Sequence, residues 1–150
     1  MTRRLLLFLV LTVACTGCKL KEEPAPEAIP APPDVAAPPA DAVRTPSGLA
    51  SKVLRPGTSN LRPTAASTVV VHYTGWTTAG KMFDSSIVRG APAEFSVQEV
   101  IPGWTEGVQL MVVGEQRRFW IPGHLAYDSS PDPNDPRGTL VFDIELIEVK

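Results

Sequence analysis

The clearest pattern along the chain is an alternation of apolar and polar residues near its carboxyl end. Between residues 139 and 149, four apolar side chains alternate with acidic ones: Leu140, Phe142, Ile144 and Leu146 against Asp143 and Glu145. Because successive side chains of a strand point to opposite faces, this pattern predicts a strand with one buried face. Residues 69–73, 81–83 and 116–121 are also predicted to be strands, and a turn at 77–80 makes the first two a hairpin.

One segment, residues 102–111, has the spacing of a helix. It begins with Pro and Gly, and the apolar side chains Trp104, Val108 and Met111 follow at spacings of four and three. These spacings place the three side chains on one helical face. The predicted fold is therefore α+β, an antiparallel β-sheet roll wrapped around one short α-helix.

The amino-terminal residues have the pattern of an export signal. Arg3 and Arg4 precede a stretch in which nine of the ten residues from 5 to 14 are apolar, and charged residues resume at Lys19. This apolar stretch is shorter than the roughly 20 residues that a membrane-spanning helix needs. We therefore predict a signal peptide at residues 1–17.

The two cysteines refine this prediction. The sequence Cys15-Thr16-Gly17-Cys18 resembles a bacterial lipoprotein cleavage site, in which the lipidated cysteine becomes the new amino terminus. Cys18 is the preferred site because a glycine precedes it and a polar sequence follows, and Cys15 is the alternative. Several acyl chains on that cysteine would anchor the protein in a membrane. Lys19 resembles the sorting pattern for the outer membrane, so we expect an envelope lipoprotein that faces the periplasm.

Residues 18–46 form a segment rich in proline and alanine. Of the 23 residues from 24 to 46, 8 are Pro, 7 are Ala and none is aromatic. Such a composition buries too little apolar surface to offset the loss of chain entropy, and proline favours an extended polyproline II conformation. We therefore expect a disordered, semi-rigid tether that is followed by a folded domain at residues 47–150.

Composition excludes several functional classes. The net charge of −2 and the absence of a basic stripe argue against a nucleic-acid partner. With only 2 histidines and 2 cysteines, no multi-cysteine metal cluster is available and little is left for a zinc site. His72 and His124 are interpreted as structural residues rather than members of a Ser-His-Asp triad. Asp84 is different, because it follows Phe83 at a strand end among aromatic neighbours that would remove water from around it.

Five motifs then occur in one order: VHYTG (71–75), FDSS (83–86), VIPGW (100–104), LAY (125–127) and LVFD (140–143). Their order and spacing resemble those of the FK506-binding-protein (FKBP) family of peptidyl-prolyl cis-trans isomerases, in its short single-domain bacterial form. The similarity extends over residues 48–150. It departs from the family at Asp128, where glycine is usual, and in the acidic, proline-rich loop 129–138.

The resemblance implies an apolar pocket for a proline ring, with Trp104 as its floor. Catalytic roles fall on Tyr73, Asp84 and Tyr127, and substrate contacts on Phe83, Phe95, Val100, Ile101, Phe142 and Arg89. In this scheme the Ile101 N–H and the Tyr127 hydroxyl donate hydrogen bonds to the substrate, and Arg89 pairs with Asp84. Taken singly, each of these residues also has a simpler interpretation. Trp104, Phe142 and Ile101 could be core residues, Asp84 could form a turn, and Tyr73 could be an aromatic residue of the sheet. Their joint spacing favours the pocket.

The implied activity is rotation about X–Pro bonds of exported proteins, without a covalent intermediate or cofactor. The implied partners are proline-containing polypeptides, macrolides of the FK506 and rapamycin type, and a lipid anchor, and we expect a monomer. The alternative is a non-catalytic lipoprotein that binds proline peptides or acts as a chaperone.

Overall fold

The computed structural model describes residues 27–150, so the predicted signal peptide and both cysteines lie outside the described residues. The strands are β1 (Val43–Arg44), β2 (Ala50–Arg55), β3 (Thr68–Thr77), β4 (Met82–Ser85), β5 (Ala93–Ser96), β6 (Gln116–Ile121) and β7 (Leu140–Val149). The helical segments are α1 (Ser86–Arg89), η1 (Val97–Glu99), α2 (Pro102–Val108) and η2 (Gly123–Leu125). No helix within residues 27–150 is long and apolar enough to cross a membrane.

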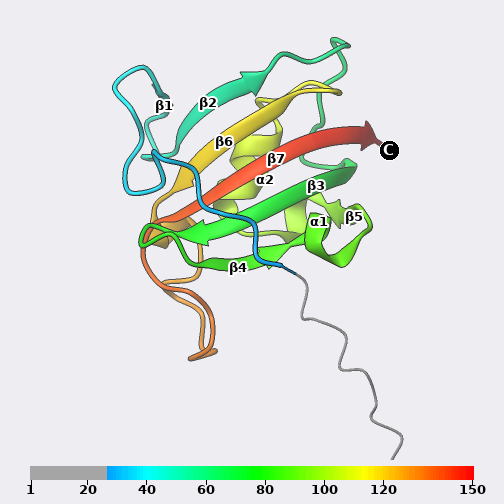
Figure 1. The fold of residues 1–150 in the computed structure, drawn as a ribbon. Coiled ribbons are helices and arrows are strands. Elements are labelled where there is room, and N and C mark those ends of the chain that lie inside the picture. Colours follow the sequence, from blue (N-terminus) through cyan, green and yellow to red (C-terminus); the bar gives the residue numbers. More distant parts are fainter. Residues whose placement is uncertain (1–26) are drawn as a thin grey trace, which may run out of the picture.

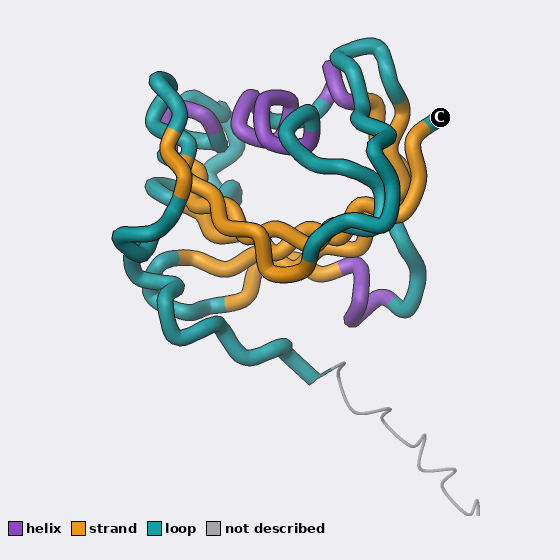
Figure 2. The backbone as a smooth tube through the Cα atoms, turned by 90° about the horizontal axis from the view of Figure 1, so that it is seen from above, coloured by secondary structure: helices purple, strands orange, loops and turns teal. Residues whose placement is uncertain are grey.

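The strands form one antiparallel sheet in the order β1-β2-β6-β7-β3-β4, and β5 also pairs with β3. Strands β3 and β7 pair along almost their whole length, from Val69 opposite Val149 to Thr77 opposite Leu140. The sheet curves, and α2 lies across its concave side (Figures 1 and 2). The predicted α+β roll with one main helix is therefore confirmed.

The strongest sequence patterns correspond to observed strands. The segments predicted at 69–73, 81–83, 116–121 and 139–149 lie in or overlap β3, β4, β6 and β7. Helix α2 ends at Val108, earlier than the predicted 111, because the chain tightens into bonds from Leu110 N to Gly107 O and from Met111 N to Val108 O. Met111 is nevertheless fully buried, as its place in the apolar pattern predicted.

Two glycines allow α2 to lie very close to β6. A Cβ atom on Gly103 would be 2.3 Å from Ile121 Cγ2, and one on Gly107 would be 2.8 Å from Phe119 Cε1. Both distances are shorter than any normal contact between side chains. The helix can therefore approach the sheet this closely only where it carries no side chain.

The Pro/Ala-rich segment differs from the disordered tether that we expected. Residues 29–42, which we call the strap, pack against the convex face of the sheet, where the blue and cyan segment runs in Figure 1. The Trp76 indole donates a hydrogen bond to the Ile29 carbonyl at 2.9 Å, and the Trp120 indole donates one to the Asp34 carbonyl at 3.0 Å. Val35 and Ala42 of the strap pack against the cluster of Ala50, Trp120 and Val141.

The physical reason for this difference lies in the sheet rather than in the strap. Two tryptophans on the convex face present indole N–H groups that need acceptors when they are covered. The strap supplies backbone carbonyls, and its Asp34 carboxylate accepts a hydrogen bond from Arg118 at 2.6 Å. Arg118 also donates two bonds to Asp143, at 2.6 and 2.7 Å, so one arginine joins the strap to β7.

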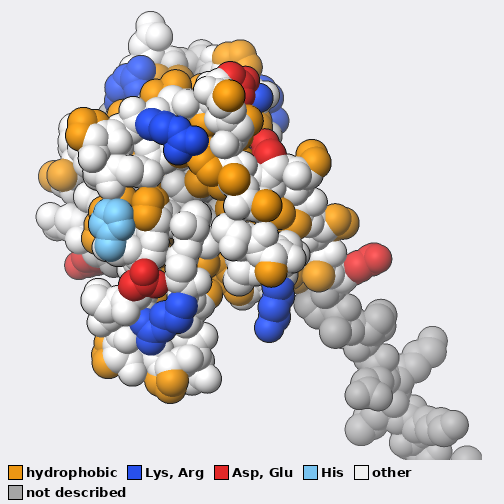
Figure 3. All heavy atoms as spheres, turned by 90° about the vertical axis from the view of Figure 1, so that its left-hand side faces the viewer, with side chains coloured by type: hydrophobic (Ala, Val, Ile, Leu, Met, Phe, Trp, Pro, Cys, Tyr) orange, Lys and Arg blue, Asp and Glu red, His pale blue; other side chains and the backbone are white. Residues whose placement is uncertain are grey.

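The part of the surface seen in Figure 3 carries acidic and basic side chains scattered among apolar and uncharged ones. Charges of one sign do not gather into a stripe on this face.

The strap has two carboxylates, and replacement of the less exposed one, Asp34, should destabilise the fold more than replacement of Asp41. Asp34→Asn weakens an ion pair whose side chains are 28% and 12% exposed, and we expect a loss of about 1 kcal/mol in the free energy of unfolding. The matched control is Asp41→Asn, because Asp41 is 66% exposed and pairs with Lys52 at 2.8 Å. It should cost less, because solvent screens an exposed ion pair. Urea unfolding measures both, and equal losses would contradict a stabilising strap.

Candidate functional site

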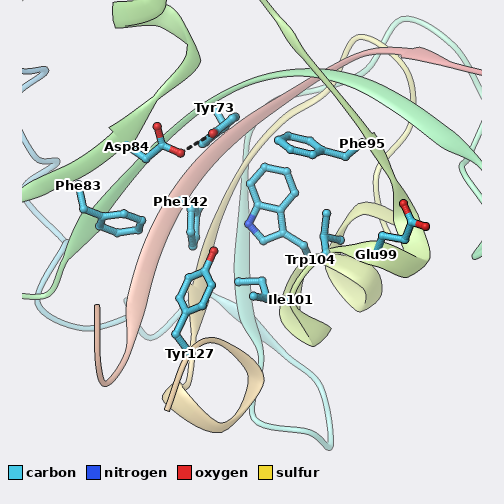
Figure 4. Close-up of a pocket in the computed structure, with 10 residues that line it drawn as sticks. Tyr73, Phe83, Asp84, Phe95, Glu99, Ile101, Trp104, Tyr127 and Phe142 are labelled. Atoms are coloured by element: carbon cyan, nitrogen blue, oxygen red, sulfur yellow. Dashed lines mark hydrogen bonds between the residues drawn. The ribbon is translucent and has the colours of Figure 1, made fainter. Parts of the chain in front are cut away.

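The concave side of the sheet contains a pocket of about 320 Å³ between α2 and the strands. Its lining comes from four strands, from η1 and α2, and from the segments before α2 and after η2: Tyr73, Phe83, Asp84, Phe95, Glu99, Val100, Ile101, Trp104, Tyr127 and Phe142. Nine of the ten residues named from the sequence are among them (Figure 4). The tenth, Arg89, reaches the pocket edge from α1 through its bonds to Asp84 and Tyr73.

Trp104 lies at the centre of this pocket. Its ring meets those of Tyr73, Phe95 and Phe142 at centroid distances of 5.1, 5.5 and 5.5 Å and at angles of 87°, 84° and 88°. Such edge-to-face contacts are the favoured geometry for aromatic pairs. Trp104 is only 5% exposed, so it belongs to the core and forms the floor of the pocket. Trp104 is therefore a core residue that also lines the pocket, and its contact with a substrate stays a prediction.

Gly75 makes room for one wall of the pocket. A Cβ atom on this residue of β3 would lie 2.6 Å from Phe83 Cζ and 2.8 Å from Phe142 Cε1. These two rings meet edge to face at 5.4 Å directly over the glycine. Sequence reasoning included Gly75 in a motif but gave it no role, although a glycine inside a strand often indicates a close approach.

A polar group of three residues forms one edge of the pocket. The Tyr73 hydroxyl donates a hydrogen bond to Asp84 Oδ2 at 2.5 Å, and Arg89 donates to Asp84 Oδ1. A second nitrogen of Arg89 donates to the Tyr73 hydroxyl at 2.8 Å, and its guanidinium lies 5.5 Å from the centre of the Tyr73 ring. Both carboxylate oxygens are therefore held in fixed directions.

The Tyr127 hydroxyl lies at the other side of the pocket and points toward Phe142 in Figure 4. Within residues 27–150 this hydroxyl has no hydrogen-bond partner, and the Ile101 N–H has none either. Burial raises the pKa of Tyr127 above its ordinary value of 10.0, and the charges of Asp135 and Asp84 raise this pKa further. The hydroxyl therefore keeps its proton at neutral pH and is available as a donor.

One lining residue was not predicted from the sequence, and the two histidines do not line the pocket. Glu99 lines the pocket, which the sequence reasoning missed although the residue directly precedes the VIPGW motif. His72 lies 3.0 Å from the Ser86 hydroxyl, and His124 lies 3.1 Å from the Ser47 carbonyl; neither lines the pocket. In the part of the chain that the structure describes, no three His, Cys, Asp or Glu side chains are grouped to hold a metal ion.

Comparison with known protein families matches residues 59–147 to the family described as FKBP-type peptidyl-prolyl cis-trans isomerase. The chain belongs to the FKBP family. FKBP-type isomerase FkpA of Aeromonas hydrophila is 49% identical over 107 residues, which are 71% of this chain and 40% of that relative. Outer membrane protein MIP of Legionella longbeachae is 46% identical over 107 residues, 70% of this chain and 46% of that protein.

Solved structures of the FKBP family have the same fold. The crystal structure of FkpA from Escherichia coli matches with a TM-score of 0.69 and 39% identity, and the match covers 75% of this chain and 53% of that one. A peptidyl-prolyl cis-trans isomerase from Pseudomonas syringae matches with a TM-score of 0.67 and 36% identity, and the match covers 75% and 83% of the two chains. The chain spans less than half the length of FkpA of Aeromonas hydrophila and of MIP.

A pH titration of Tyr73 and Tyr127 should show that the pKa of each hydroxyl is raised. Burial and the hydrogen bond to Asp84 raise the pKa of Tyr73, so both tyrosines should ionise above 10.0 in near-ultraviolet absorbance. Because the folded chain holds these protons more tightly, their contribution to stability is complete below the ordinary pKa and is lost as the pH rises through the folded pKa.

The same titration can separate the two residues. Asp135→Asn should lower the pKa of Tyr127 and leave that of Tyr73 unchanged, because Asp135 acts only on Tyr127. Tyr127→Phe assigns the transitions. A tyrosine that ionises at or below 10.0 would contradict the described environment.

Proposed function

We propose that this chain catalyses cis–trans isomerisation of X–Pro bonds in exported polypeptides. The observation that carries the proposal is the pocket itself. Its aromatic floor lies between the Asp84 carboxylate on one side and the Tyr127 hydroxyl on the other. Its volume of about 320 Å³ suits a proline ring with parts of the neighbouring residues. Membership of the FKBP family supports the same activity.

The chemistry requires that a planar amide be twisted. Resonance in the C–N bond produces a barrier of about 18–20 kcal/mol to this rotation. In the twisted state the resonance is lost, nitrogen becomes more basic and the carbonyl dipole is more localised. A site that favours the twisted state over both planar states accelerates the reaction without forming a bond to the substrate.

The pocket residues have the properties that such a site needs. Trp104 and the rings around it exclude water from the proline ring and the amide, which removes solvation of the planar form. The Ile101 N–H and the Tyr127 hydroxyl are donors without partners in the described chain, so both can bind substrate carbonyls. The carboxylate of Asp84, oriented by Tyr73 and Arg89, lies beside the twisting amide as a fixed negative charge. An acceleration of ~10⁵-fold corresponds to about 7 kcal/mol.

The same pocket is proposed to accept macrolides of the FK506 and rapamycin type, which would compete with the peptide. Since one chain supplies every lining residue, we propose that a monomer is sufficient for this activity.

Isomerisation of an Ala-X-Pro-Phe peptide, followed by exchange spectroscopy, tests this function. Tyr127→Phe removes one hydrogen bond, so we expect kcat/KM to fall about tenfold, the equivalent of about 1.4 kcal/mol. Asp84→Ala should reduce it further, because a charged group is lost and Tyr73 and Arg89 lose their shared partner. The strap variant Asp41→Asn is the control and should not change it.

The outcome separates the enzyme from its alternative. If the natural chain binds the peptide but does not accelerate its isomerisation, the isomerase proposal is wrong. The chain would then be a module that binds proline peptides or acts as a chaperone. Binding and acceleration that are both insensitive to Tyr127→Phe and Asp84→Ala would place the activity elsewhere.

We further propose that the chain is a lipoprotein of the cell envelope, anchored through Cys18 to the outer membrane and facing the periplasm. The basic and apolar leader and the Gly17-Cys18 step support this location. So does the similarity to a relative whose name is outer membrane protein MIP.

Metabolic labelling with a fatty acid tests the anchor. Cys18→Ser should abolish the label and release the protein from the membrane fraction, whereas Cys15→Ser should retain both. The reverse result would assign the lipid to Cys15, and label in neither natural nor variant chain would refute the anchor.

A further inference from the structure

The loop between Tyr127 and Gly138 departs most from the family pattern, and it begins with a pocket residue. It contains no helix or strand and extends away from the sheet as the orange segment in Figure 1. Irregular loops on a surface are usually mobile, and ordering one costs conformational entropy. The position of Tyr127 therefore depends on whatever holds this loop.

One side chain near the end of the loop binds three of its carbonyl groups. Arg137 donates hydrogen bonds to the carbonyl oxygens of Tyr127, of Ser130 at 2.9 Å and of Asp132 at 2.8 Å. A guanidinium presents several N–H donors in a rigid plane, so it can join separate backbone groups in one geometry. The Tyr127 carbonyl also accepts a bond from Ser130 N at 2.9 Å, so two donors hold this carbonyl.

Asp128, which stands where the family usually has glycine, closes the neck of the loop. Its Oδ1 accepts a hydrogen bond from Gly138 N at 2.8 Å, and its own N–H donates to the Gly123 carbonyl at 3.1 Å. The carboxylate lies so close to Gly123 that a Cβ there would be 2.0 Å from Oδ2. The two ends of the loop are thereby joined to each other and to η2.

The Tyr127 hydroxyl itself has no partner within residues 27–150, in contrast to that of Tyr73, which is bonded to Asp84 and Arg89. Packing of the Tyr127 ring against the hydrophobic core limits its movement. No hydrogen bond in the described chain holds the hydroxyl, so its position also depends on the backbone of the loop. A donor that is held in place before the substrate arrives loses less freedom on binding.

We propose that Arg137 and Asp128 are positioning residues that act through Tyr127. They form a clasp, and this clasp holds the Tyr127 hydroxyl at the pocket edge in the geometry that the substrate carbonyl requires. The proposal rests on the isomerase function above, since it assigns the clasp an effect on that reaction.

A double-mutant cycle tests the clasp in the full chain, with the Ala-X-Pro-Phe peptide as substrate. Arg137→Ala should lower kcat/KM about tenfold, because misplacement of a catalytic group by a fraction of an ångström has effects of this order. In the Tyr127→Phe background the same substitution should change kcat/KM less than about twofold, since the hydroxyl that it positions is already absent.

Two further variants separate positioning from general stability. Arg62→Ala is the matched control, because Arg62 also donates to a backbone carbonyl, that of Leu110, and does not line the pocket. It should leave kcat/KM within about twofold of the natural value, as expected for a site far from the reaction. Asp128→Asn keeps an oxygen that can accept from Gly138 N and should retain activity, whereas Asp128→Ala should behave like Arg137→Ala. The Asp128 pair provides the test if Arg137→Ala does not fold.

The proposal is overturned if Arg137→Ala has no effect, or if its effect is equally large with Phe at position 127. If the natural chain binds the peptide without accelerating it, the isomerase fails but the clasp is still tested. The same cycle is then measured on peptide affinity by calorimetry, where coupling between Arg137 and Tyr127 supports the clasp and additivity refutes it.

Discussion

The close approach of α2 to β6 is the constraint on which the rest of the structure depends. Gly103 and Gly107 allow the helix to rest directly on Ile121 and Phe119, and this depth brings Trp104 into edge-to-face contact with rings on three strands. A methyl group at either glycine would force the helix outward or displace the side chain beneath it. The floor of the pocket would then separate from its walls.

Some residues of this protein belong both to its hydrophobic core and to the lining of its pocket. Tyr73, Trp104 and Phe142 belong to the main hydrophobic cluster, yet each also lines the cavity. Packing that stabilises the fold therefore also fixes the shape of the site, since close-packed interiors transmit small changes in volume. Two features add polar edges to this rigid base. One is the bonded group of Tyr73, Asp84 and Arg89, and the other is the loop after Tyr127, in which the Arg137 side chain bonds backbone carbonyls.

The features that could be predicted from the sequence are those encoded locally. The alternation in β7 indicated its buried face, and the five motifs contain eight of the pocket-lining residues; the ninth, Phe95, was named only through the family resemblance. The strap could not be read in this way, because its order comes from indole donors on Trp76 and Trp120, which are 47 and 86 residues away from their acceptors. Strands β2 and β5 were missed for a related reason, since they are defined by their pairing with β6 and β3. The clasp depends on where the Arg137 side chain reaches, which no periodicity describes.

The distribution of the 3 tryptophans gives the chain two independent optical reporters. Trp104 lies under the pocket, whereas Trp76 and Trp120 lie on the opposite face with their indole groups bonded to the strap. Indole emission responds to the polarity around the ring and to hydrogen bonds at its nitrogen. Occupation of the pocket and detachment of the strap therefore change the fluorescence of different residues, so the two events can be followed separately in one unlabelled molecule.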